Sequence, residues 1–241
     1  MQQTATPHQI NVSESGAERD GRPQTLDRRL FMQLQVFGGC KEPQQIAAEM
    51  KQRSFGGVLY QDLNDPRGIG ILAMSEDPAF FAADFREMLN SGSFLALVHK
   101  PEFTMLGRTY SSGYEQDLED WLLLRPRRTV LNRDWPWAIW YPLRRSGAFA
   151  RLDPKEQGAI LREHAAIGRA YGEADLAHDI RLACHGLDTR DNEFVIGLVG
   201  PDLHPLSHIV QTMRKTRQTA EFIQTMGPFF VGRVLWQSPM S

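Results

Sequence analysis

The chain has 241 residues, with 41% hydrophobic and 23% charged side chains and a formal net charge of −2 at pH 7. This composition is typical of a folded globular protein, and the near-neutral charge argues against nucleic acid or an anionic membrane as a partner. No apolar run reaches the roughly 20 residues that a membrane-spanning helix needs.

The N-terminal segment, residues 1–29, is polar and rich in Gln, Ser, Thr and Glu. It lacks the apolar core of a secretory signal, and its composition predicts a disordered tail. The two cysteines, Cys40 and Cys184, show no CxxC spacing and indicate inert thiols rather than a redox pair. These features favour a cytoplasmic location.

Residues 30–109 predict a unit with the order β-α-β-β-α-β. Turn residues divide this stretch into strands at 30–37, 58–63, 69–74 and 94–99 and helices at 43–53 and from 75–78 to about 90. This order is the ferredoxin-like unit.

Residues 136–241 predict the same order again. The expected strands are 137–144, 179–185, 193–199 and 229–236, and the expected helices run from 153 to about 171 and over 205–215. The prediction is therefore an α+β fold of two fused ferredoxin-like repeats. The connecting segment, residues 110–135, is long for a compact domain, and such a connection is often functional.

His164 lies on the apolar face of the helix predicted from residue 153. At 100° per residue, Ile160, Ile167 and Tyr171 fall within about 60° of it. A lone histidine in such a place is more often a core residue than a ligand. Gly168, one turn further, favours a ligand, because it leaves room for a flat molecule beside the imidazole. A neutral imidazole facing an apolar slot is the usual axial ligand of haem iron.

Tyr141 lies on the strand predicted at 137–144 and shares a face with Ile139 and Leu143. Pro142 cannot donate a backbone hydrogen bond, which predicts an edge strand or a bulge at this point. Taken alone, a buried strand tyrosine usually packs in a core and donates one hydrogen bond. Arg169, about 140° round the helix from His164, is either a surface charge or a group that holds a carboxylate at a pocket rim.

Several motifs of the second half resemble the chlorite dismutase-like superfamily of haem proteins, and most closely its coproheme decarboxylases, the peroxide-dependent haem synthases. The matching segments are YPLRR at 141–145, EHAAIGRAY at 163–171, HGLD at 185–188, DNEFVI at 191–196, MR at 213–214 and GPFFVGR at 227–233. The first half matches in architecture and in short pieces such as YSSGY at 110–114. No motif is diagnostic alone, but their order and spacing are specific.

The resemblance implies a dimeric α/β-barrel fold with haem in the C-terminal repeat, and a homopentamer. It also implies hydrogen peroxide-dependent decarboxylation of two propionates of iron coproporphyrin III to give haem b. By motif position, His164 resembles the proximal iron ligand and Tyr141 the tyrosine that becomes a radical. Propionate-binding positions of the family correspond here to Arg145 (a lysine in the family), Arg169, Thr219 and either Arg127 or Arg128.

The chain departs from the family where the group on the distal side of the iron is expected. Ala177 occupies the position of the distal arginine of chlorite dismutases and of the glutamine of one group of decarboxylases. Re-aligning the segment 172–179 brings Asp179 or Arg181 to this place, with His178 adjacent. The three residues stand as alternatives.

Two other functions stay open beside decarboxylation. One is the conversion of chlorite to chloride and dioxygen, which Tyr141 disfavours. The tryptophan pair of chlorite dismutases is also absent, because the corresponding positions are Phe149 and Ala150. The other is a haem-binding or dimeric α/β-barrel protein without catalysis.

Overall fold

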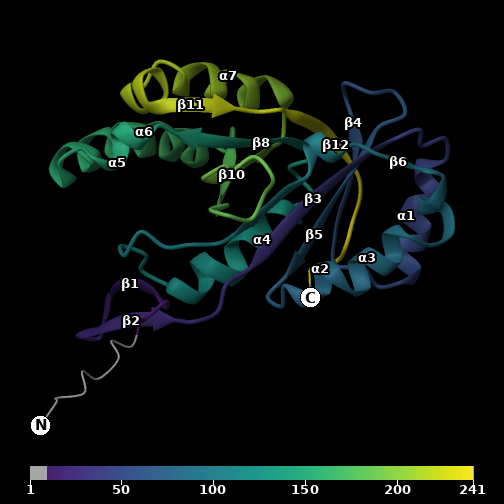
Figure 1. Cartoon of the computed structure of the whole chain (residues 1–241), viewed down its shortest axis with the longest axis horizontal. Coiled ribbons are helices and arrows are strands. Elements are labelled where there is room, and N and C mark those ends of the chain that lie inside the picture. The colour runs from purple at the N-terminus through teal and green to yellow at the C-terminus, as the bar shows by residue number, and fades with distance from the viewer. Residues whose placement is uncertain (1–9, 241) are drawn as a thin grey trace, which may run out of the picture.

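The computed structural model describes residues 10–240, and its main body is a 10-stranded antiparallel sheet with helices packed on the outside (Figure 1). The strand order is β7-β3-β5-β4 in the first half and β12-β8-β10-β9 in the second. Both are the order of a ferredoxin-like sheet. Pairing of β4 with β12 and of β7 with β9 closes the two sheets into one barrel. The predicted α+β fold is confirmed.

The first repeat contains a short pair of helices where one helix was predicted. Its elements are β3 (Phe31–Gly38), α1 (Pro43–Gln52), β4 (Gly57–Asp62), β5 (Ile69–Ser75), α2 (Ala79–Ala82), α3 (Asp84–Leu89), β6 (Val98–His99) and β7 (Met105–Arg108). The helix predicted up to residue 90 breaks at Ala83, whose φ of −112° and ψ of −97° are not helical.

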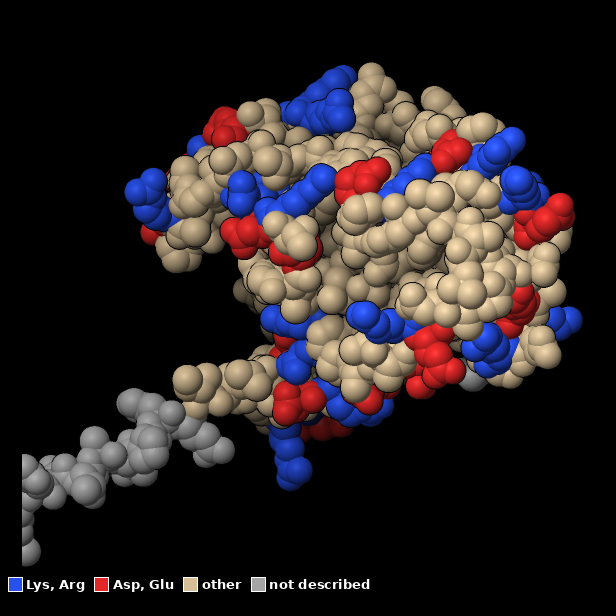
Figure 2. Space-filling model, turned by 45° about the vertical axis from the view of Figure 1, so that its right-hand side comes forward, with Lys and Arg blue, Asp and Glu red and all other residues tan. Residues whose placement is uncertain are grey.

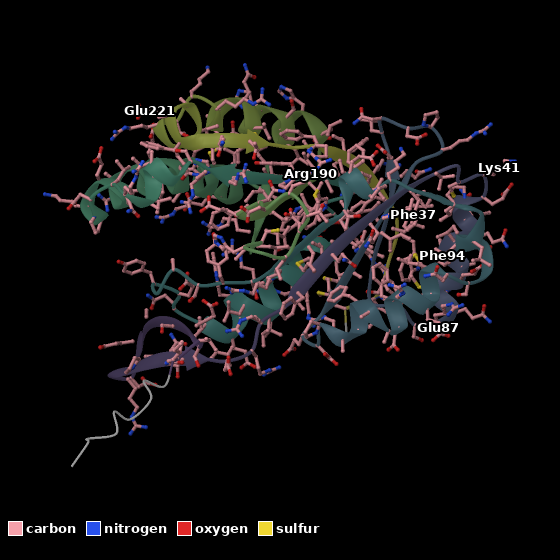
Figure 3. The ribbon with its side chains drawn as sticks, in the orientation of Figure 1. Phe37, Lys41, Glu87, Phe94, Arg190 and Glu221 are labelled. Atoms are coloured by element: carbon pink, nitrogen blue, oxygen red, sulfur yellow. The ribbon has the colours of Figure 1, made fainter. Side chains whose placement is uncertain are left out.

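The strand predicted at 94–99 is wrong. Residues 92–96 form a short helical turn, and only the two residues of β6 pair with β3. Phe94 belongs to the apolar layer under the helices of the first repeat, as does Phe37 of β3 (Figure 3), and this packing takes Phe94 out of the sheet. The last strand of the repeat is instead β7, which the sequence pattern did not predict.

The second repeat contains every predicted strand and helix. Its elements are β8 (Trp137–Arg145), α5 (Gly147–Ala150), α6 (Pro154–Glu173), β9 (His178–Ala183), β10 (Phe194–Gly200), α7 (Leu203–Met213), β11 (Ile223–Met226) and β12 (Phe230–Gln237). The carboxylate of Asp153 caps α6 by accepting a hydrogen bond from the Lys155 amide at 2.8 Å. α5 and β11 are additional to the prediction.

β8 is a central strand, so of the two alternatives predicted at Pro142, an edge strand or a bulge, the edge strand is wrong. β10 pairs along one side of β8. On the other side, β12 pairs with residues 137–140 and β11 pairs with residues 143–145. The Pro142 carbonyl accepts a hydrogen bond from Gly227, in the link between β11 and β12. Pro142 is tolerated because its missing N–H falls at the gap between two partner strands.

The N-terminal segment is partly ordered, which corrects the prediction of a disordered tail. β1 (Glu14–Arg19) and β2 (Arg22–Leu26) form a hairpin, while residues 1–9 lie outside the described part of the chain. The connecting segment, which contains α4 (Arg125–Val130), binds this hairpin: the Ala17 amide and the Gln24 side chain both donate to the Glu115 carbonyl. Composition does not reveal such tertiary hydrogen bonds.

Three apolar layers hold the barrel together. One fills its interior, with Tyr60, Trp140 and Phe230 among the largest side chains. A second lies under the helices of the first repeat, and a third lies between α6, α7 and the outer face of β8 and β10. Within residues 10–240, none of the helices combines the length and hydropathy needed to cross a membrane.

Candidate functional site

The outer face of three neighbouring strands forms the floor of the candidate site. Paired positions on β8, β10 and β9 are Tyr141, Ile196 and Arg181 in one row and Ile139, Leu198 and Asp179 in the next. Paired residues of an antiparallel sheet share a face. A tyrosine, an aspartate and an arginine therefore meet on a surface that is otherwise apolar.

His164 faces this floor from α6, and a hydroxyl network orients its ring. The Nδ1 atom of His164 lies 3.5 Å from Oγ1 of the buried Thr216, and that hydroxyl donates to the Met213 carbonyl at 2.8 Å. Because a hydroxyl has only one proton, Thr216 can accept a hydrogen bond from Nδ1 while it donates to the Met213 carbonyl. This network leaves the lone pair of His164 on Nε2, which has no hydrogen-bond partner among the described residues.

The surroundings of His164 keep its imidazole neutral. Burial lowers the pKa of His164 below its usual value, and the Arg181 cation lowers it further, while Asp179 and Glu163 partly oppose this shift. A neutral imidazole with a free Nε2 is the form that binds a metal ion.

The space beside His164 is open. A side chain added at Gly168 would meet only the Met213 methyl group, at 3.8 Å. Ile167, Phe229 and Ile196, which line the same region, are only partly buried. α6 thus covers the sheet without tight packing at this point, as a slot for a flat apolar molecule requires.

Tyr141 is 7% exposed, and its ring stacks on Phe229 with centroids 4.6 Å apart. Its hydroxyl forms no hydrogen bond with any described residue. Burial raises the pKa of Tyr141 far above its usual value and Asp179 adds to this shift, while Arg214 opposes it. The site therefore contains a neutral phenol whose hydroxyl is available to a ligand.

Arginines surround this group. The Arg145 guanidinium lies over the rings of Phe149 and Phe194, and its Nε is 3.1 Å from a Glu193 carboxylate oxygen. Arg181 pairs with Asp179 at 2.9 Å. Arg145 lies on β8, Arg181 lies on β9, and a third cation, Arg214, follows the last residue of α7. In Figure 2 the surface is hollowed between the lobe of the second-repeat helices and the region where the N-terminal segment emerges, with basic side chains on both sides.

The connecting segment adds Tyr110, which the prediction did not include. Its ring lies 5.6 Å from that of Phe194. Burial raises the pKa of Tyr110, while Arg181 and Arg145 oppose this shift. A small cavity is lined by Tyr110, Asp179 and Arg181. The YSSGY and MR motifs already contain Tyr110 and Arg214 and were the available signals for both.

Some of the residues predicted to bind propionates lie near His164 and Tyr141, and others do not. Thr219 joins the hydroxyl network, with its Oγ1 3.3 Å from that of Thr216. Arg169 is exposed on α6, and no described carboxylate pairs with it. Arg127 points toward Glu76 of the first repeat, with Nη2 4.0 Å from Oε1, and so lies outside the group.

Of the other two arginines of α4, Arg128 lies away from the candidate site and Arg125 reaches it. Arg128 forms two hydrogen bonds with Asp120, at 2.6 and 3.1 Å, and does not reach the floor of the site. The α4 residue that reaches it is Arg125, whose Nη2 is 3.9 Å from Oδ1 of Asp179.

The three residues predicted as alternatives for the distal side of the iron, His178, Asp179 and Arg181, do not all face His164. His178 stacks on Trp135 at a centroid distance of 3.5 Å and bonds Asp175, away from His164. Asp179 and Arg181 lie on the face that His164 and Tyr141 share, because alternate residues of β9 point to the same side.

Residues 44–235 match the sequence profile of the chlorite dismutase family. The chain belongs to the chlorite dismutase family. Its fold is similar to that of a haem-binding protein from Thermus thermophilus, with 18% identity, a TM-score of 0.67 and coverage of 87% of this chain and 92% of that one. It is also similar to the chlorite dismutase of Candidatus Nitrospira defluvii bound to imidazole, with 12% identity, a TM-score of 0.66 and the same coverage. No curated protein matches the chain.

Proposed function

We propose that this chlorite dismutase family member binds an iron porphyrin between α6 and the outer face of β8 and β10. His164 would hold the iron through Nε2, because this atom carries a free lone pair and the imidazole is neutral. The residues present fit the group: Gly168 leaves room beside the ring, and the partly buried apolar side chains supply the walls. When bound, the iron porphyrin would react with hydrogen peroxide as the oxidant, and the peroxide would be reduced to water.

The substrate that the site supports best is iron coproporphyrin III, which carries four propionates. Guanidinium groups hold carboxylates with paired, charge-assisted hydrogen bonds. Arg145, Arg181 and Arg214 lie around the floor, and Arg169 stands unpaired among the described residues on α6. Thr219 adds a hydroxyl donor next to Thr216. Arg127 is not part of this proposal, because it points toward Glu76.

The observation that carries the proposal is the unbonded, neutral hydroxyl of Tyr141 on the floor opposite His164. Tyr141 gives up an electron, which goes to the reduction of the peroxide, and its hydroxyl proton, which ends in the water that is formed. The tyrosyl oxygen then takes a hydrogen atom from the β-carbon of a propionate. The carbon radical then loses carbon dioxide and one more electron, which completes the two-electron reduction of the peroxide, and a vinyl group is left. Each round uses one peroxide, and two rounds give haem b.

The test is Tyr141→Phe, which removes the hydroxyl and keeps the ring that stacks on Phe229. We expect this variant to bind iron coproporphyrin III like the wild type and to leave its mass unchanged after peroxide is added. Tyr114→Phe is the control, because Tyr114 is 82% exposed. Undiminished decarboxylation by Tyr141→Phe would remove the proposed mechanism.

Chlorite conversion is the second candidate, and Arg181 is the observation that favours it, because it places a guanidinium on the face opposite His164. Release of dioxygen on adding chlorite to the haem-loaded protein would favour this function. A haem-binding protein without catalysis would show neither dioxygen nor a change in porphyrin mass.

A further inference from the structure

Two exposed histidines lie side by side on α7, outside the slot described above. His204 and His208 are four residues apart, so they occupy the same face of the helix one turn from each other. Their ring centroids are 6.0 Å apart, with an angle of 48° between the ring planes. The His164 network lies at the opposite end of α7, where Thr216 follows the helix.

A chain of hydrogen bonds selects which ring nitrogen of His208 carries the proton. The Thr212 hydroxyl donates to the His208 carbonyl at 2.9 Å and lies 3.3 Å from the Tyr171 oxygen. The Tyr171 oxygen also bonds Nδ1 of His208. Each hydroxyl has one proton, so all three bonds form together in one direction only. Thr212 donates to the carbonyl, Tyr171 donates to Thr212, and Nδ1–H of His208 donates to Tyr171.

This direction leaves the lone pair of neutral His208 on Nε2. A partner that holds the Nδ1 proton is the usual companion of a metal-binding imidazole, because it selects the tautomer and orients the ring. Tyr171 comes from α6, so it fixes His208 from a second helix that packs against α7. His208 is thus set in advance for binding a cation through Nε2.

We propose that His204 and His208 bind a divalent transition-metal ion, with copper(II) preferred over zinc(II). Two imidazoles at i and i+4 on one helix face are a common metal-binding pair, and copper(II) is the divalent ion of the first transition row that nitrogen ligands bind most tightly. Metal–nitrogen bonds of about 2.0–2.1 Å bring two ring centres to within roughly 6.5 Å of each other. The observed 6.0 Å is inside this limit, and the His204 side chain, which is exposed, has room to turn toward His208.

The site has two protein ligands. Within residues 10–240, no group of three or more His, Cys, Asp or Glu side chains is placed to hold a metal ion. Water must complete the coordination, which gives an exchangeable site rather than a closed structural one. In this arrangement Tyr171 is a positioning residue that acts through His208.

The haem-free full-length protein should be titrated with copper(II) chloride and with zinc(II) chloride by calorimetry in a buffer that does not bind metals. We expect a copper(II) site whose affinity falls at least about tenfold in His204→Ala and in His208→Ala. Electron paramagnetic resonance of the copper(II) complex should show two nitrogen ligands in the wild type and one in each variant. His99→Ala, which changes an exposed histidine of the first repeat, should leave both readouts unchanged.

Tyr171→Phe tests the positioning role. It keeps both imidazoles but removes the acceptor of the Nδ1 proton, so we expect weaker copper(II) binding with two nitrogen ligands still present. Equal affinity of wild type, His204→Ala and His208→Ala, with all three folded by circular dichroism, would overturn the proposal. So would a copper(II) spectrum that is the same in all three proteins.

Discussion

Single hydroxyl groups determine which histidine nitrogens are free in this protein. Thr216 accepts from Nδ1 of His164 because its own proton is bonded to the Met213 carbonyl, and Nε2 is left with the lone pair. Because this one hydroxyl sets the tautomer, its substitution is expected to change the ring orientation of His164.

The partly buried His164 should make the haem-free protein less stable in acid. Its pKa in the folded state lies below the value of about 6.5 expected in the unfolded chain. The stability that neutral His164 contributes is therefore complete above about pH 6.5, the pKa in the unfolded chain. It is lost as the pH falls from there through the lower pKa of His164 in the folded state. We expect the free energy of unfolding, measured in urea, to fall more steeply below about pH 6.5 in the wild type than in His164→Gln. Parallel curves would show that His164 is not buried in its neutral form.

Asp179→Asn should lower the pKa of Tyr141, because it removes a negative charge that raises it. Burial remains, so the pKa of Tyr141 should stay above that of an exposed tyrosine. Titration of ring-labelled tyrosine by nuclear magnetic resonance in the haem-free protein measures this shift. Asp191→Asn, on an exposed turn, is the control. An unchanged titration of Tyr141 in Asp179→Asn would mean that the carboxylate does not act on it.

The choice among His178, Asp179 and Arg181 shows what motif spacing cannot provide. The sequence identified all three, but the loop between α6 and β9 differs in length from the family pattern, so counting from His164 reaches Ala177. Only the start of β9 and its pairing with β10 decide which of the three face the slot.

At the scale of elements, two of the three glycines of α6, Gly158 and Gly168, lie in different surroundings. Gly168 borders the slot, whereas the space at Gly158 is limited only by the flexible Arg162 side chain, at 3.2 Å. Alanine in place of glycine within a helix gains about 0.5–1 kcal/mol. We expect both Gly158→Ala and Gly168→Ala to stabilise the haem-free protein by this amount.

The two variants should differ in haem binding. The methyl group of Gly168→Ala narrows the space beside His164, so the affinity for iron coproporphyrin III should fall while Gly158→Ala binds like the wild type. Spectroscopic titration with the porphyrin measures both. If Gly168→Ala also binds like the wild type, the ligand does not pass beside this turn of α6.

The elements that the sequence predicted well are those with a strong apolar pattern or a clear cap. β8, α6 and β10 are of this kind, with Asp153 and Pro154 opening α6. β7 was missed because it is only four residues long. The apolar residues around Phe94 predicted a strand. In the structure, packing under the helices of the first repeat determines the position of Phe94 instead.

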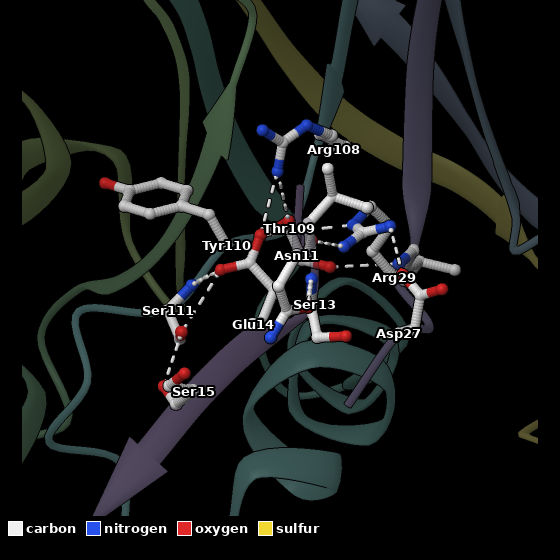
Figure 4. A network of polar contacts seen from close by, with 12 residues as sticks. Asn11, Ser13, Glu14, Ser15, Asp27, Arg29, Arg108, Thr109, Tyr110 and Ser111 are labelled. Carbon is white, nitrogen blue, oxygen red and sulfur yellow. Dashed lines mark hydrogen bonds and ion pairs between the residues drawn. The ribbon is translucent and has the colours of Figure 1, made fainter. Parts of the chain in front are cut away.

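At the scale of the whole molecule, the N-terminal hairpin is fastened to the segment that carries Tyr110. The Glu14 carboxylate bonds Arg108 at 3.0 Å and the Ser111 amide at 2.9 Å (Figure 4). Ser111 adjoins Tyr110, so the hairpin supports one wall of the slot from residues far away in the sequence. Composition alone did not reveal this contact.

Glu14→Ala should loosen that wall. It leaves Arg108 and Ser111 without their partner, and hydrogen bonds to a charged group contribute about 1.5–3 kcal/mol each. We expect faster amide exchange at residues 110–115 and lower stability. Glu18→Ala, on the exposed side of the same hairpin, should change neither. Equal exchange rates in the two variants would show that the hairpin does not hold this segment.

The central proposal is that the protein converts a porphyrin bound between α6 and β8. The most direct measurement loads the full-length protein with iron coproporphyrin III, adds hydrogen peroxide and follows the mass of the porphyrin. We predict two successive losses of carbon dioxide, ending at haem b, in the wild type and none in Tyr141→Phe. A porphyrin that binds but keeps all four propionates after peroxide would contradict the proposed function.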